Sequence, residues 1–173
     1  MPIQGSEFAG QVEAVGRGVT SFKAGDRVFG FTGFRFGAHA EYLVMPADGS
    51  LATIPGGLTY EQAAPSTEGA IYALSFIRTA RVRRGHDVLV NGATGAIGSA
   101  AVQLLQPLGA KVTATCDTGH LEPVKGLGAD RVIDHTAEDF TRDRHADVVI
   151  DAVGKSSGRK IGNVVISVAR SGR

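Results

Sequence analysis

The stretch 88–98, VLVNGATGAIG, places closely spaced glycines directly after a β-branched apolar run. Gly95 and Gly98 match the second and third glycines of the pattern G-x-G-x-x-G, and Ala93 stands at the first. In that pattern the middle glycine lets backbone approach a pyrophosphate, and the last lets a helix pack on a strand. The helix N-terminus then faces the anion. The spacing predicts a strand, a tight turn and a helix that bind a dinucleotide; a glycine-rich turn in another α/β protein is the alternative.

These residues are the first group of expected cofactor contacts: Ala93, Thr94, Gly95, Ala96, Ile97 and Gly98. A second strand is predicted at 111–115, and Asp117 lies just past its end. That is close to the offset of about 20 residues at which an acid holds a ribose hydroxyl. An ordinary turn residue is the other interpretation of Asp117. Cys116 has no base near it in the sequence, so we expect a buried small hydrophobe rather than a nucleophile.

The elements that must position these residues change character along the chain. Up to about residue 55, glycines separate short runs with strand-like patterns, which predicts a compact β-barrel-like unit with strands at 10–16, 26–31 and 40–46. Thr59 is a capping residue type at a helix start, and apolar spacing predicts a helix over 66–80.

Beyond the glycine turn, strands and helices alternate. We expect a helix over 121–127 ending at Gly128, followed by strands at 131–134 and 147–151. This alternation calls for a parallel sheet with right-handed crossovers. The predicted class is α/β: a partial barrel followed by a parallel sheet with helices, with its second half incomplete.

Composition excludes several functional classes. The 173 residues are 43% hydrophobic, enough for a substantial core, and 18 Lys and Arg balance 17 Asp and Glu. That balance favours neither a nucleic-acid nor a membrane partner. Without a predicted membrane span or signal pattern, we expect a cytoplasmic protein. One cysteine excludes an internal disulfide and a multi-cysteine zinc site.

Four ordered motifs carry a family resemblance: GSEFAGQV at 5–12, GDRVFG at 25–30, GAHAEY at 37–42 and the 92–98 turn. Together they resemble the medium-chain dehydrogenase/reductase superfamily, and within it the quinone oxidoreductase and zeta-crystallin-like members. The resemblance implies a GroES-like catalytic domain at 1–65, joined by the C-terminal strand of 159–173, and a Rossmann domain at 66–158. It also implies that NADPH or NADH gives hydride to a small quinone, enone or related carbonyl compound.

Individual residues refine this resemblance. Ser6-Glu7 stands where zinc-dependent relatives carry His-Glu, which favours the zinc-free branch. Relatives that prefer NADPH use Ser, Arg, Lys or Tyr where this chain has Asp117, His120 and His135, so the preference between the two cofactors stays open. Either histidine can pair with a phosphate when protonated, or lie solvated at the surface. Ile71 replaces a Thr near the nicotinamide, and we expect it in a helix core.

The resemblance also implies missing pieces. Relatives have several dozen residues before the segment that matches Gly5, and their last Rossmann strands would fall at a junction near Ser156–Gly158. We therefore expect an exposed sheet edge and a homo-oligomer, unless 161–168 folds back to pair there. No catalytic residue is predicted. The leading function is an NAD(P)H-dependent oxidoreductase; the rivals are a non-catalytic nucleotide-binding module and an interaction protein.

Overall fold

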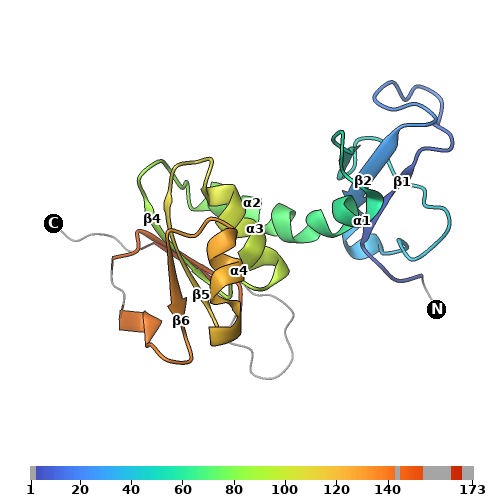
Figure 1. Cartoon of the computed structure of the whole chain (residues 1–173). Helices are drawn as coiled ribbons and strands as arrows, with labels where there is room; N and C mark the ends of the chain where they lie inside the picture. The colour runs from blue at the N-terminus through green and yellow to red at the C-terminus, as the bar shows by residue number, and fades with distance from the viewer. Residues whose placement is uncertain (1–2, 143–144, 154–164, 169–173) are drawn as a thin grey trace. The chain divides into compact units, whose positions relative to one another are not determined.

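The computed structural model describes residues 3–142, 145–153 and 165–168 (Figure 1). The chain divides into two units, Met1–Glu68 and Gly69–Arg173, each with its own sheet. The division falls after Glu68, close to the boundary after residue 65 in the sequence analysis. The expected junction near Ser156–Gly158 lies outside the described residues. Among those residues, no helix is long and apolar enough to cross a membrane.

The first unit is built on a three-stranded antiparallel sheet in the order β1-β2-β3. Its strands are β1 (Glu7–Gln11), β2 (Arg27–Phe31) and β3 (Leu51–Thr53). Gly30 lies in the central strand β2, at a position where a larger residue does not fit, because a Cβ there would fall onto the Ser50 carbonyl oxygen and the Phe8 ring. Close contact between neighbouring strands therefore requires this glycine.

Two of the strands predicted in this unit differ from the structure. The strand expected at 10–16 ends at Gln11, and the one expected at 40–46 is irregular. Tyr42 and Val44, whose alternation suggested a strand, are 76% and 97% exposed. Alternation predicts a strand only where one face is buried, and these side chains find no such face. The three-residue β3 is too short to give a periodic signal.

Two helices follow as predicted. The short α1 (Tyr60–Ala63) begins with a capping box, in which the Gln62 N–H donates to Thr59 Oγ1 (3.3 Å) and the Thr59 N–H donates to Gln62 Oε1 (3.0 Å). Helix α2 (Glu68–Thr79) lies within the predicted range 66–80.

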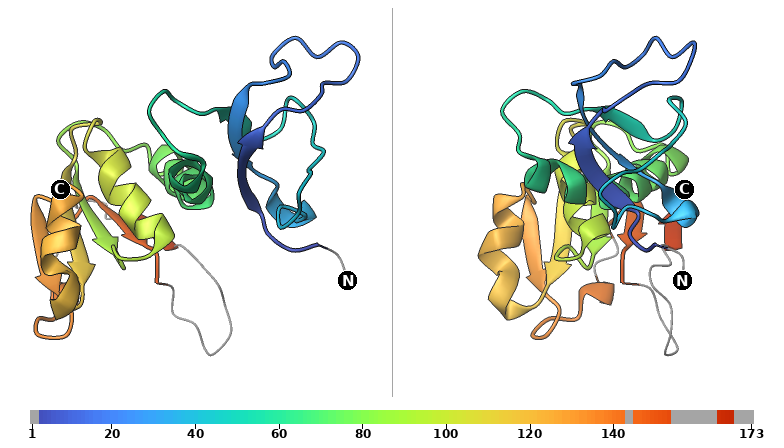
Figure 2. Two further views of the ribbon diagram at one scale, coloured as in Figure 1. Left: turned by 45° about the vertical axis from the view of Figure 1, so that its right-hand side comes forward. Right: turned by 90° about the vertical axis from the view of Figure 1, so that its right-hand side faces the viewer.

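The second unit contains a five-stranded sheet in the order β6-β5-β4-β7-β8. Its strands are β4 (Asp87–Asn91), β5 (Lys111–Cys116), β6 (Arg131–Asp134), β7 (Val148–Asp151) and β8 (Val165–Val168). The first four pair in parallel, as the alternation predicted. Helices α3 (Ala96–Leu105) and α4 (Leu121–Gly126) lie in front of this sheet in Figure 1, and Figure 2 shows them from two further sides.

The core of this unit lies between the central strands and the helices. Val88, Val90 and Val112 are almost completely buried, and Val102 and Leu105 of α3 pack in the same cluster. Fully burying one such aliphatic side chain stabilises a fold by about 1.5–3 kcal/mol. The carboxyl ends of β4, β5, β6 and β7 are thereby fixed at one edge of the sheet.

Strand β8 corrects one expectation. The segment 159–173 was expected to join the first unit, whereas β8 pairs antiparallel with β7 in the second, with Val148 opposite Val168 and Asp151 opposite Val165. An uncovered β7 would present unpaired backbone groups, and a returning strand satisfies them. This is the alternative in which the segment folds back onto the sheet.

Candidate nucleotide site

The turn between β4 and α3 begins at Gly92, whose φ of +82° is a conformation that L side chains rarely adopt. The Gly95 N–H donates to the Gly92 carbonyl (3.2 Å), and Gly95 then caps α3 by accepting from the Ser99 N–H (2.9 Å). The sequence analysis aligned Ala93 with the first glycine of the pattern. Gly92 makes the turn instead, and the spacing Gly92-x-x-Gly95-x-x-Gly98 was the available signal.

The protein itself requires glycine at two of the three glycine positions of this turn, for two different reasons. Gly92 is required by its positive φ. Gly98 is required by packing, because a Cβ there would fall onto the Gly92 carbonyl oxygen. Gly95 has an ordinary φ of −78°, and a Cβ would meet only the Gly92 oxygen at 3.7 Å. Among the described residues, neither backbone conformation nor packing requires glycine at position 95, and none of them fills the space before it.

Donor groups line this open space. Thr94, Gly95 and Ala96 are exposed, and the N–H groups of Ala96 and Ile97, in the first turn of the ten-residue α3, have no acceptor in the described part of the chain. A helix N-terminus with free N–H groups favours a bound anion. Ala93 differs: its side chain is fully buried and its N–H donates to the Thr115 carbonyl (3.0 Å), so it offers no donor to a ligand.

Asp117 lies at the same edge of the sheet, directly after β5. Its Oδ1 accepts from the Gly119 N–H (3.0 Å) and contacts His120 Nδ1 (2.7 Å). The hydrogen bond with His120 is the largest cause that lowers the pKa of Asp117 below its usual range. The carboxylate is therefore ionised at neutral pH and accepts hydrogen bonds only.

His135 follows β6 and donates its backbone N–H to the Cys116 carbonyl (3.0 Å), which holds it beside the end of β5. The neighbouring Asp134 accepts from Thr118 Oγ1 (2.5 Å) and from the hydroxyl and N–H of Thr136. These bonds lower the pKa of Asp134. The strand ends thus bring Asp117, His120 and His135 to the edge that carries the glycine turn, although they are far apart in sequence.

Two further expectations have opposite outcomes. Cys116 is only 2% exposed, and burial, followed by the charges of Asp117 and Asp134, raises the pKa of its thiol, as expected for a core residue. Ile71 was expected in a helix core but is 39% exposed. The buried residues of α2 fall on the face that contains Gly69, Ala73 and Ile77. Ile71 lies two residues beyond Gly69 and so on the opposite side of the helix.

Within the described residues, no group of three or more His, Cys, Asp or Glu side chains could hold a metal ion. Ser6 Oγ donates to Glu68 Oε2 (3.3 Å), while Glu7 Oε1 accepts from Thr67 Oγ1 (2.9 Å) and the Glu68 N–H (2.8 Å). The Ser6-Glu7 pair therefore fixes the start of α2. The zinc-free assignment stays a prediction, for which elemental analysis is the test.

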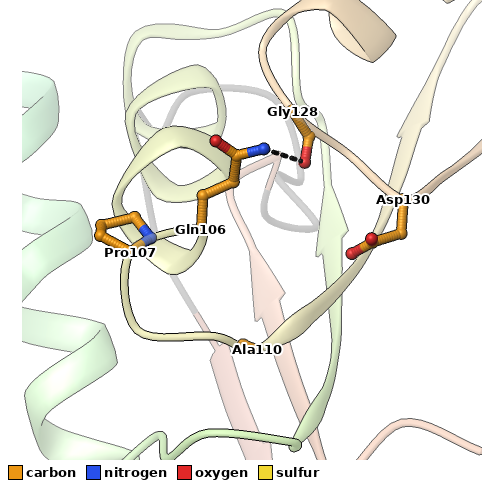
Figure 3. A pocket seen from close by; sticks show the side chains of 5 residues that line it. All are labelled: Gln106, Pro107, Ala110, Gly128 and Asp130. Atoms are coloured by element: carbon orange, nitrogen blue, oxygen red, sulfur yellow. Dashed lines mark hydrogen bonds between the residues drawn. The ribbon is translucent and has the colours of Figure 1, made fainter.

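A hollow of about 360 Å³ lies at the opposite edge of the sheet, beside the first residues of β5 and β6 (Figure 3). It is lined by Gln106, Pro107, Ala110, Gly128 and Asp130. Three of its polar atoms have partners: Gln106 Nε2 donates to the Gly128 carbonyl (3.2 Å), and the Val112 N–H donates to Asp130 Oδ2 (2.7 Å). The donors suited to an anion are at the carboxyl edge instead.

Comparison with known proteins supports a two-part chain. Residues 1–56 match the alcohol dehydrogenase GroES-like domain, and residues 96–173 match the family described as zinc-binding dehydrogenase. A quinone oxidoreductase of Sus scrofa is 36% identical over 168 residues, which cover 95% of this chain and 47% of that protein. A trans-enoyl reductase of Aspergillus terreus is 32% identical over 161 residues, which cover 87% of this chain and 45% of that protein.

The Escherichia coli quinone oxidoreductase, solved as a complex with NADPH, has a TM-score of 0.75 and 31% identity, covering 88% of this chain and 49% of that chain. This chain therefore spans about half the length of the relatives that it matches. Both domain families match in the order that the sequence motifs indicated. The chain belongs to the medium-chain dehydrogenase/reductase superfamily of oxidoreductases, in its quinone oxidoreductase branch.

Proposed function

We propose that this chain binds NADPH or NADH at the carboxyl edge of its parallel sheet and takes part in the reduction of a small quinone, enone or related carbonyl compound. The observation that carries the proposal is Gly95, a glycine required by neither backbone conformation nor packing, beside exposed N–H groups of α3. A bulky group approaching from outside is a physical reason for such a glycine. The relatives named as quinone and enoyl reductases support the substrate class.

In this proposal different residues bind different parts of the cofactor. The N–H groups of Thr94, Ala96 and Ile97 bind the pyrophosphate, helped by the positive end of α3. The Asp117 carboxylate accepts hydrogen bonds from the ribose hydroxyls of the adenosine. His120 and His135 lie where a 2′-phosphate would be read, so they bear on the choice between the two cofactors.

The reduced nicotinamide, when bound, supplies the hydride that an electron-poor carbonyl or conjugated double bond accepts. The residues of this chain bind and orient: the Asp117–His120 pair at the carboxyl edge is assigned to the adenosine end of the cofactor and not to the reacting carbonyl. We therefore propose no catalytic residue.

Gly95→Val tests the proposal. Gly95 has an extended conformation and free space around it, so the Gly95→Val protein should fold, with its unfolding transition lowered only because valine is a poorer N-cap of α3 than glycine. The same side chain fills the space that the pyrophosphate approaches, so binding of NADPH and NADH should fall by more than about 100-fold. Gly126→Val is the matched control, since it places the same side chain on an exposed glycine in open space at the far end of α4.

Calorimetric titration with each cofactor and thermal unfolding of each variant separate the outcomes. Unchanged affinity in a folded Gly95→Val protein would refute the site. Turnover of NADPH with simple quinones, at rates within the ordinary range of about 1–10³ per second, would establish the reductase activity.

A non-catalytic nucleotide-binding module is the second candidate. It is favoured by one observation: the groups proposed for the pyrophosphate and the adenosine ribose lie at one sheet edge, and no described residue is assigned to the reacting carbonyl. Cofactor binding without quinone turnover would support this candidate over the first. The homo-oligomer is also part of the proposal, at a different strand from the one first expected: β7 is paired with β8, and β8 is the outermost described strand on that side, whose outer edge can pair with another copy. Light scattering tests it.

A further inference from the structure

A row of three polar side chains crosses the carboxyl edge of the sheet at the level where the glycine turn begins. Asn91 ends β4, with Thr115 opposite it on β5 and Asp151 opposite it on β7. Thr115 is fully buried, and Asn91 and Asp151 are half-buried. A buried hydroxyl among apolar strands is costly unless its hydrogen bonds are made. The proposed contacts with the cofactor use none of the three side chains.

The hydrogen bonds of this row run in one direction. The Gly92 N–H donates to Thr115 Oγ1 (3.1 Å), Thr115 Oγ1 donates to Asn91 Oδ1 (2.6 Å), and Asn91 Nδ2 donates to Asp151 Oδ1 (2.9 Å). A carboxylate only accepts, so Asp151 holds the amide nitrogen of Asn91 on its own side. The amide oxygen then faces Thr115 and takes its only proton. The hydroxyl oxygen is left to accept from Gly92.

The donors of the turn depend on the two peptides that flank Gly92. The Gly92 N–H belongs to the peptide before it, whereas the Gly92 carbonyl belongs to the peptide after it, accepts from the Gly95 N–H (3.2 Å) and lies where a Cβ on Gly98 would fall. Thr115 holds the turn twice, because its carbonyl also accepts from the Ala93 N–H (3.0 Å). The side chain of Thr115 therefore fixes the peptide before Gly92 and its backbone carbonyl fixes the peptide after Gly92, so the two together hold the turn at which α3 begins.

We propose that Thr115, oriented by Asn91 and Asp151, is a positioning residue for the pyrophosphate: it aims the N–H groups of the 94–97 turn without touching the ligand. The inference rests on the proposed nucleotide site. It assigns a role to a buried threonine that is separate from the exposed glycine turn and from the ribose acid.

Thr115→Val removes the hydroxyl at nearly constant volume, and Thr115→Ser keeps it. Thr113→Val is the matched control, because Thr113 lies two residues earlier on the same strand and its side chain makes no hydrogen bond to the described residues. ADP-ribose, which contains the pyrophosphate, and adenosine, which lacks it, are the probes. Calorimetry measures the first ligand and ligand-observed NMR the second.

For Thr115→Val we expect binding of ADP-ribose to weaken by about tenfold, since a misdirected turn loses about one charge-assisted hydrogen bond. Adenosine should bind within about twofold of the wild type, and Thr115→Ser and Thr113→Val should match the wild type for both ligands. A loss shared equally by the two ligands would show a merely structural role. An unchanged affinity for ADP-ribose would overturn the inference.

Asn91→Leu covers the case in which Thr115→Val does not fold. It frees the Thr115 hydroxyl to turn while leaving it able to accept from Gly92, so we expect a smaller loss, about threefold, confined to ADP-ribose. An equal loss for adenosine, or none for ADP-ribose, counts against the inference. Wild-type protein that binds neither ligand would instead refute the nucleotide site itself, which keeps the two failures distinct.

Discussion

The two units contain similar residue types and bury them very differently. In the described part of the first unit the buried apolar residues are Val28, Ile54 and Ala63, while Phe34, Tyr42 and Val44 are largely exposed. In the second unit the central strand β4 buries its three middle residues completely or nearly so. A parallel sheet is covered on both faces, which makes its strands continuous apolar runs. The second unit is therefore the rigid support, and the binding groups lie at its edge.

The largest expected effect tests this difference in burial directly. Leu105→Ala removes a fully buried side chain from α3 and should lower the free energy of unfolding by about 2–5 kcal/mol. Ile54→Ala, at the partly covered edge of the first unit, should cost roughly half as much. The chain has no tryptophan, so far-UV circular dichroism in urea is the appropriate measurement. Equal costs would break the comparison.

Replacing one glycine in each unit compares how closely the backbones of the two units are packed. Gly98→Ala forces a methyl group onto the Gly92 carbonyl and should destabilise the second unit by about 1–3 kcal/mol. Gly10→Ala in β1 meets nothing within 4 Å, so its effect should stay within about 0.5 kcal/mol. Thermal unfolding of the two variants provides the measurement, and a neutral Gly98→Ala would contradict the close contact.

Thiol reactivity compares the burial of one side chain in each unit. The single cysteine, Cys116, is buried and its pKa is raised, so at neutral pH a disulfide reagent should modify it more than about tenfold more slowly than in the urea-unfolded protein. In Cys116→Ser combined with Val44→Cys, the new thiol should react at the unfolded rate, because Val44 is exposed. Rapid labelling of native Cys116 would show that the strand ends open readily.

The smallest expected effect concerns the acid limb of the stability profile, that is, the decline of the free energy of unfolding at acid pH. Hydrogen bonds from Thr118 and Thr136 lower the pKa of Asp134 from 3.8, so their stabilisation is complete above that pH and is lost as the pH falls through the lower folded-state value. Asp134→Asn should therefore flatten the decline of stability below about pH 4. Glu61→Gln in the first unit should act in the same direction, because a backbone hydrogen bond at Glu61 and a bond from Thr59 lower its pKa as well. An unchanged acid limb in both variants would exclude these carboxylates as its source.

The sequence predicted the well-buried second unit better than the sparsely buried first unit. Strands β2, β4, β5, β6 and β7 and helices α2 and α3 lie where periodicity and glycines placed them, because burial on one or both faces imposes a regular pattern. The strand expected at 40–46 was wrong, because its alternation has no buried face to match. Ile71 was misjudged because helical spacing alone did not show which side of α2 is covered.

At the candidate site, the sequence predicted the strand–turn–helix and placed Asp117 after the next strand, and their contacts with a cofactor stay a prediction, whereas the roles of Gly92, Asn91 and Thr115 were missed. The role of Gly92 depends on its positive φ, and those of Asn91 and Thr115 depend on the register between β4, β5 and β7. A local pattern contains neither quantity. The pairing of β8 with β7 was likewise one of two alternatives, because strand pairing is a long-range choice.

The three residues of the polar row at the carboxyl edge are synthesised at different times. Thr115 follows Asn91 by 24 residues, whereas Asp151 follows it by 60. At about 5–20 residues per second, the ribosome adds the intervening 36 residues in roughly 2–7 seconds. For that interval the nascent chain has the hydroxyl that accepts from Gly92 but not the carboxylate that orients the amide. The turn is thus completed by β7, the last of the described parallel strands to be synthesised, and the ability to hold an anion is expected to arise late in translation.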